Sequence, residues 1–275
     1  MNGTPPEKIR PPLVEGLFYP EDPAEIDAAL SSFETACGVP RGKALAIVTP
    51  HAAWEKAGNL MASAFLAAAD RKIRTAVLIG PVHRDFTDEI ILPESEVFSI
   101  PTGAFRVDTQ KAEELLSCGT RFVRSDIPHL EEHCLETQLP FLLRYFPGVK
   151  ILPVLLGKDT AANIKALGSG LYISFSADIE STLFIVTTNL CESREDAKAR
   201  AEADEICALA EKKDSSALAE GKLSRHFTAC GAGCLAAVLK LPGAGPLRIL
   251  GRAWSASDAQ TGRRVEYAAM AMEAS

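Results

Sequence analysis

Two short apolar runs in this chain each end in a turn that combines a proline with a histidine. The first covers residues 44–51 and ends at His51, and the second covers residues 75–83 and ends at His83. Short runs of this kind, bounded by Gly or Pro, are typical of buried strands in an α/β sheet. Because binding sites in such sheets gather beyond the carboxyl ends of the strands, we expect the two histidines to share a pocket.

The rest of the chain alternates predicted strands with predicted helices. Further strands are predicted at 149–156, 182–188, 247–254 and 264–272, and helices at 24–33, 57–69, 131–145, 194–213 and 230–239, with one more after Asp108. The last two strands are expected to pair antiparallel. This order predicts an α/β fold, a three-layer α/β/α sandwich around a mixed, largely parallel sheet. No linker divides the chain, so residues 1–275 are expected to form a single domain.

Composition narrows the class of partner. The formal net charge is −7 and no Lys/Arg-rich tract is present, which argues against nucleic acid. No apolar run is long enough for a membrane span, and the polar, proline-rich N-terminus lacks a signal-peptide core. The seven cysteines are scattered and form no CxxC pair, so neither a disulfide framework nor a zinc ribbon is indicated. We expect a cytoplasmic protein.

Metal binding is the chemistry that a pair of strand-end imidazoles favours. Neutral imidazole suits iron, copper, zinc or nickel, and a pair of histidines needs at least one more ligand. The alternative, that each ring only caps a turn or bonds to a buried carbonyl, is weaker for two equivalent positions than for one. Cys230 is predicted at a helix N-terminus, where the helix dipole stabilises a thiolate. Burial as a small apolar residue is the alternative for Cys230.

Two further candidates come from a strand end and from a predicted helix. Glu192 follows the 182–188 strand and could add a carboxylate to His51 and His83, although solvated loop glutamates are common. His133 and Glu136 share the polar face of the 131–145 helix, which either meets water or lines the pocket with acid–base groups. The remaining histidines, His129 and His226, are interpreted as structural. No P-loop, GxGxxG, GxSxG or HExxH motif is present.

Read together, these segments resemble the Memo-like family, which includes the Memo-like protein of the AmmeMemoRadiSam set. The matching segments are residues 12–20 (PLVEGLFYP against AGxFYP), 50–52 (PHA against PHAGY), 80–83 (GPVH against GPSH), 102–108 (TGAFRVD against TPLGxVxVD), 132–141 (EHCLETQLPF against EHSLExQLPF), 229–231 (ACG), 257–258 (SD) and 267–269 (YAA). They cover almost the entire chain, so the resemblance is more specific than any single motif.

The resemblance implies a fold related to the class III extradiol dioxygenases, which are non-haem iron enzymes. It also implies that His51, His83 and Cys230 converge on one iron or copper ion. The family's SSDxSHY turn reads TTNLCES at 187–193, so that Glu192 stands where the family has a histidine. Catechol ring cleavage is therefore not implied, because the most obvious proton acceptor is replaced.

We therefore expect a metalloprotein that oxidises an unknown substrate, with Glu192 and His133 tuning the site or moving protons. A different reading makes the same pocket a non-catalytic binding site for a small molecule, a peptide or a partner protein, such as the radical-SAM member of the AmmeMemoRadiSam set. A third reading is metal-free thiol chemistry at Cys230, activated by a nearby histidine.

Overall fold

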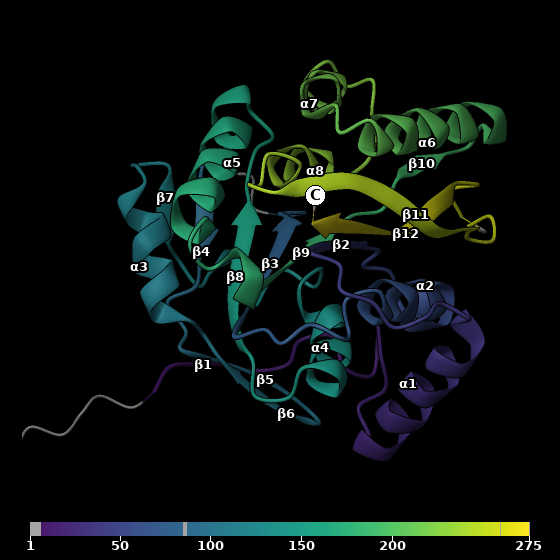
Figure 1. Cartoon of the computed structure of the whole chain (residues 1–275). Helices are drawn as coiled ribbons and strands as arrows, with labels where there is room; N and C mark the ends of the chain where they lie inside the picture. The colour runs from purple at the N-terminus through teal and green to yellow at the C-terminus, as the bar shows by residue number, and fades with distance from the viewer. Residues whose placement is uncertain (1–6, 85–86, 259, 275) are drawn as a thin grey trace, which may run out of the picture.

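A mixed β-sheet lies at the centre of the molecule, between two layers of helices (Figure 1). The structure is a computed structural model that describes residues 7–84, 87–258 and 260–274. Four parallel strands form the middle of the sheet, in the spatial order β2 (Ala46–Thr49), β9 (Thr182–Thr187), β3 (Thr75–Pro81) and β8 (Lys150–Leu156). The predicted strands at 44–49, 75–80, 149–156 and 182–188 are confirmed.

The outer strands make the sheet mixed. β12 (Arg264–Ala274) pairs antiparallel with β2, and both β10 (Cys191–Ser193) and β11 (Ala244–Trp254) pair antiparallel with β12. At the other side, β4 (Ile90–Leu92) is antiparallel to β8 and parallel to β7 (Phe122–Arg124). The predicted antiparallel pairing of the two C-terminal strands is therefore confirmed.

Helices cover both faces of the sheet, which explains why β3 is buried along its whole length. One face packs against α1 (Pro23–Cys37), α2 (Trp54–Leu66) and α4 (Leu139–Tyr145). The other packs against α3 (Thr109–Ser117), α5 (Ala161–Phe175), α6 (Asp196–Glu211), α7 (Ser215–Leu223) and α8 (Ala232–Val238). The three-layer α/β/α sandwich is confirmed. None of the helices in the described part of the chain has the length and apolar character needed to span a bilayer.

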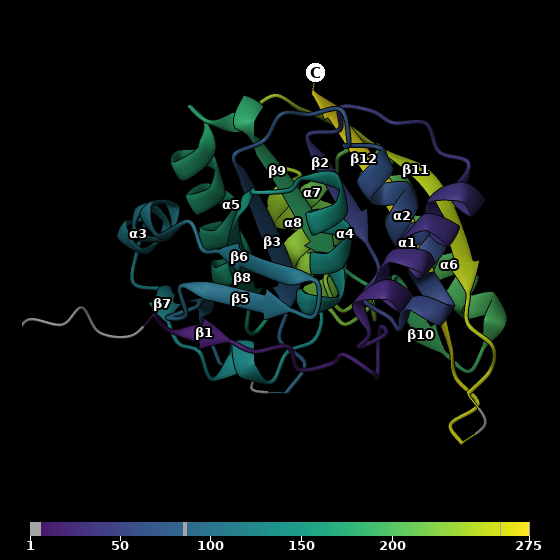
Figure 2. The same cartoon turned by 90° about the horizontal axis from the view of Figure 1, so that it is seen from below.

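A second, small sheet packs on the α1–α2–α4 face (Figure 2). It consists of β1 (Ile9–Arg10), β5 (Val97–Ile100) and β6 (Gly103–Arg106), with β5 in the middle. Short 3-10 turns, η1 (Pro128–Leu130), η2 (Glu136–Gln138) and η3 (Ile179–Ser181), complete the described elements.

Two predicted helices are shorter than the sequence pattern suggests. The predicted helix at 131–145 is wrong in its first half, because α4 begins only at Leu139, after the 3-10 turn η2. Pro140 lies in the first turn of α4, where a missing N–H costs nothing, and so does not bend a longer helix. The predicted helix at 230–239 begins at Ala232, which leaves Cys230 in the preceding loop.

A buried ion pair fixes the irregular segment that replaces the first half of that predicted helix. Arg10 and Glu136 are 2% and 1% exposed, and their Nη1 and Oε2 atoms lie 2.7 Å apart. The Glu136 carboxylate also accepts hydrogen bonds from the Leu13 and Val14 amides and from the Tyr19 hydroxyl. Glu136 therefore binds the N-terminal segment and does not line a pocket or meet water.

We predict that Glu136→Gln lowers the free energy of unfolding by about 3–5 kcal/mol, because it leaves the Arg10 guanidinium buried without a counter-charge. Urea unfolding monitored by circular dichroism measures the change. The control is Asp70→Asn, which breaks the half-exposed Arg41–Asp70 pair and is expected to cost less than about 1 kcal/mol. Equal losses in the two variants would contradict the structural role of the buried pair.

Candidate metal centre

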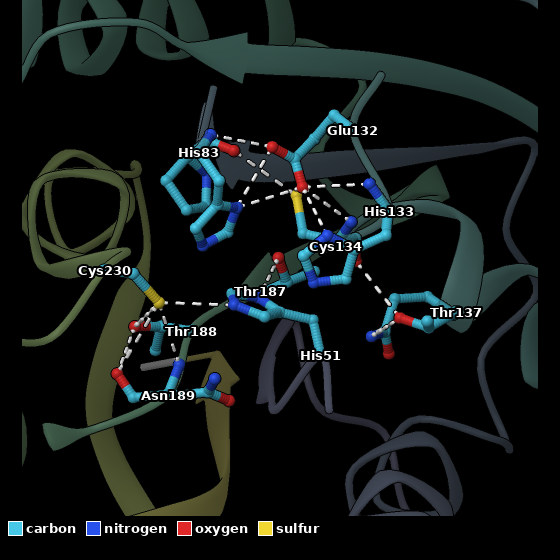
Figure 3. A network of polar contacts seen from close by, with 12 residues as sticks. His51, His83, Glu132, His133, Cys134, Thr137, Thr187, Thr188, Asn189 and Cys230 are labelled. Carbon is cyan, nitrogen blue, oxygen red and sulfur yellow. Dashed lines mark hydrogen bonds and ion pairs between the residues drawn. The ribbon is translucent and has the colours of Figure 1, made fainter. Parts of the chain in front are cut away.

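Three histidines from separate parts of the chain converge beyond the carboxyl ends of the parallel strands (Figure 3). His51 follows β2, His83 follows β3, and His133 lies in the loop before η2. One ring nitrogen of each lies within 4.8 Å of the others. The ring centroids are 5.0 Å apart for His51 and His83, and 5.5 and 5.1 Å from each of these to His133. This group of three imidazoles could hold a metal ion.

The Nδ1 atom of each ring already has a protein partner. His51 Nδ1 lies 3.1 Å from the hydroxyl of Thr187, the last residue of β9. His83 Nδ1 and His133 Nδ1 lie 3.0 and 3.1 Å from Oε1 of Glu132. A metal ion would then bind at the opposite nitrogens, Nε2, and carboxylate or hydroxyl support at Nδ1 is typical of metal-ligating histidines.

Glu132 is the site residue that the sequence reasoning missed. Its side chain is buried, and its carboxylate accepts hydrogen bonds from the backbone amides of His83 at 2.8 Å, His133 at 2.9 Å and Cys134 at 3.0 Å. The carboxylate thus orients two of the three rings and ties His83, which follows β3, to the loop that carries His133. The only sequence signal for Glu132 is its place beside His133 at the start of the EHCLE motif, and the sequence alone does not assign this glutamate a role.

Cys230 borders the three histidines from the loop before α8. Its Sγ atom lies 3.3 Å from His51 Nε2 and accepts a hydrogen bond from the Asn189 amide at 3.3 Å. The next residue, Gly231, packs so closely on β9 that an added Cβ would lie 2.5 Å from the Thr187 carbonyl oxygen. Glycine is therefore required for the cysteine to approach the strand end.

Charges within this group shift the pKa values of its members. Burial alone would raise the pKa of the Cys230 thiol. The charge of His51 and hydrogen bonds from His51 and His83 outweigh burial and bring this pKa well below its usual range. For His83, burial lowers the pKa, while hydrogen bonds to Cys230 and Glu132 raise it to about 10. Burial likewise opposes ionisation of Glu132, yet hydrogen bonds to His133 and His83 bring its pKa below the usual range. The group favours a thiolate and a carboxylate on either side of the histidines.

The structure does not bring Glu192 into this group. Glu192 lies on β10, where its half-exposed carboxylate pairs with Arg263 at 3.1 Å. The chain turns back after β9 to pair with β12, and this carries Glu192 away from the strand end. The two histidines interpreted as structural also lie elsewhere: His129 Nε2 faces the Ile91 carbonyl at 3.2 Å, and exposed His226 pairs with Glu205.

A cavity of about 700 Å³ opens beside the group, with His83 and Cys230 in its wall. A small organic molecule fits a space of this size. The arrangement therefore combines a cluster of metal-ligand types with room for a ligand next to it.

Comparisons with known proteins agree with the resemblance. The family model for Memo-like proteins matches residues 10–271. The chain is 31% identical over 243 residues to a MEMO1 family protein of Thermoplasma acidophilum, covering 84% of this chain and 85% of that protein. It is 30% identical over 261 residues to a MEMO1 family protein of Thermotoga neapolitana, covering 90% and 93%.

We predict that, in protein freed of metal by a chelator, Cys230 reacts with iodoacetamide at pH 6, where an ordinary thiol is almost wholly protonated. Its lowered pKa leaves more thiolate at that pH, whereas burial raises the pKa of Cys191 to about 12 and of Cys207 to about 11. Peptide mass spectrometry over pH 5–9 follows each site. His51→Ala is expected to slow labelling of Cys230 at pH 6, because it removes the imidazole that lowers the pKa of this thiol most. Unchanged labelling in that variant would contradict the assignment.

Proposed function

The chain belongs to the Memo-like family, and we propose that it is a metalloprotein that holds one redox-active ion, iron or copper, and oxidises a small substrate bound beside it. The observation that carries this proposal is the set of three converging imidazoles whose Nδ1 atoms are all engaged by Thr187 or Glu132. Imidazole and thiolate together suit iron, copper or zinc and disfavour magnesium or calcium.

The donor set fits such an ion. We assign His51, His83 and Cys230 as ligands, with His133 as a further nitrogen donor or as the group that moves a proton to or from the substrate. A nitrogen and a sulfur bound to one tetrahedral ion lie about 3.5 Å apart. The separation of His51 Nε2 and Cys230 Sγ is 3.3 Å, which supports their sharing an ion. When bound, iron or copper supplies the redox chemistry.

The protein's own groups prepare the site. Glu132 accepts from the Nδ1 atoms of His83 and His133 and so fixes the orientation of both rings. The Thr187 hydroxyl does the same for His51. Hydrogen bonds to Cys230 and Glu132 raise the pKa of His83 to about 10, so an ion must compete with a proton there and its apparent affinity rises with pH.

The first test is the metal content of protein purified without oxygen or chelators. We expect near-stoichiometric iron or copper by elemental analysis, and loss of it in a His51→Ala/His83→Ala double variant. Glu192→Gln is the control and is expected to keep its metal, since Glu192 lies outside the histidine group.

Bound zinc would keep the metal site but contradict the redox function. No metal, even after anaerobic reconstitution with Fe²⁺ or Cu²⁺, would contradict the whole proposal and favour a non-catalytic protein that binds a peptide, small ligand or partner.

The second test addresses Glu132. Removing the charge of a carboxylate that supports ligating histidines typically costs about 10–100-fold in metal affinity, and we predict a loss of that size in Glu132→Gln. Competition with a chromophoric chelator measures the affinity. The neighbouring Glu131 is exposed and provides the matched control, Glu131→Gln, which is expected to bind as the parent does. Equal affinities in the two variants would remove Glu132 from the site.

A further inference from the structure

The cavity beside the histidine group has a wall of cations. Besides His83 and Cys230, three basic residues line it: Lys158, Lys222 and Arg225. The only carboxylate in that wall, among the described residues, is Asp159. The excess of positive charge stands out in a chain whose formal net charge is −7. A cleft lined by one sign of charge concentrates ligands of the opposite sign.

Two of these cations have no side-chain partner in the described part of the chain. The Lys158 ammonium and the Arg225 guanidinium are exposed and form no ion pair or hydrogen bond with any residue that the structure describes. Lys222 is less free, since its Nζ donates to the Ala229 carbonyl at 2.7 Å and lies 3.5 Å from Asp159 Oδ2. Lys222 therefore offsets the charge of Asp159, and the other two cations remain available to a ligand.

The backbone fixes Arg225 at the cavity. It follows the end of α7 with φ +63°, a left-handed position that usually takes glycine after a helix. An arginine there carries backbone strain that a glycine would avoid. The turn is held by the Phe227 amide, which donates to the Gly221 carbonyl at 3.0 Å, and by the Phe227 ring, which lies 2.2 Å from where a Cβ of residue 221 would be.

Apolar surface completes the wall. Phe227 and Leu223 line the cavity together with Pro81 and Val82, which precede His83. The cavity thus offers apolar side chains, free cations and two members of the histidine–cysteine group, His83 and Cys230, in one wall. Apolar pockets with a few placed charged groups are the usual form of a small-molecule site.

We propose that the substrate of this protein is a small organic anion, with a carboxylate or phosphate group on a partly apolar body. Lys158 and Arg225 bind the anionic group, Phe227 and Leu223 contact the body, and the far end of the molecule reaches the site of His83 and Cys230. This inference rests on the proposed function in calling the anion a substrate; the binding of the anion does not depend on a metal. Guanidinium suits both groups, because its paired N–H donors match carboxylate and phosphate oxygens.

Calorimetric titration with three probes tests the proposal: benzoate, phenyl phosphate and the neutral isostere benzamide, each against metal-free and metal-loaded protein. We expect one or both anions to bind at least about tenfold more tightly than benzamide, since a charge-assisted hydrogen bond contributes about that much or more. Tighter binding of benzoate identifies a carboxylate, and tighter binding of phenyl phosphate identifies a phosphate. No preference for either anion over benzamide would overturn the proposal.

A pair of double variants locates the binding. Lys158→Gln/Arg225→Gln is expected to weaken anion binding about tenfold or more and to leave benzamide unaffected. Lys165→Gln/Lys198→Gln removes the same charge from exposed positions on α5 and α6 and should bind as the parent does. Equal weakening in both variants, or in neither, would contradict this cavity as the site.

Metal content, measured on the same samples, separates the two proposals. Anion binding by a parent protein that takes up no metal would contradict the proposed function and keep the anion site. Metal uptake without anion preference would do the opposite.

Discussion

The histidine group depends on one buried carboxylate, that of Glu132. It accepts hydrogen bonds from two imidazole rings and from the backbone amides of His83, His133 and Cys134. These bonds hold His83, which follows β3, against the loop before η2. Burial by itself would oppose its ionisation, and the hydrogen bonds to His133 and His83 keep its pKa below the usual range. A buried carboxylate here with only some of its hydrogen bonds would destabilise the fold. Glu132 and the groups that donate to it therefore act as one unit.

That unit is in turn attached to the N-terminal segment. The Arg10 guanidinium donates to the Glu132 carbonyl oxygen at 3.0 Å and to the His129 carbonyl oxygen at 2.7 Å, and it also pairs with the buried Glu136 carboxylate. Arg10 lies on β1, which pairs with β5 in the small sheet. The small sheet therefore supports the site, because its strand β1 supplies the arginine that fixes the irregular loop carrying His133.

The sequence was most informative where regular elements end. His51 and His83 were expected to meet because each follows a parallel strand, and strands of one sheet present their carboxyl ends at one edge. The position of His133 could not be predicted in the same way, since it depends on an irregular loop held by side chains from residues 10 and 132. A helical wheel placed His133 and Glu136 on one face, whereas the structure turns the first to the histidine group and buries the second against Arg10.

Glu192 shows the opposite difficulty. Glu192 follows the end of β9 by only a few residues, which suggested a place at the site. The chain reverses there, however, and pairs with β12. Cys230 was predicted to owe its reactivity to a helix dipole, yet α8 begins after it, and the adjacent histidines are the cause of its lowered pKa. The family resemblance pointed to Cys230, and the positions of the strand ends pointed to the two histidines. Neither predicted the residues that support the rings, Glu132 and Thr187.

The separation of these groups along the chain has a consequence for folding. His51 and Cys230 are 179 positions apart, and β9, which comes between β2 and β3 in the sheet, supplies the hydroxyl that holds His51. The donor atoms come together only when the central strands have all assembled. Contacts between residues far apart in the sequence must therefore form before the site is complete. An ion bound by both residues closes a loop of most of the chain, and the entropy of closing such a loop grows with its length. Such an ion would act as a reversible cross-link between the first and last thirds of the polypeptide.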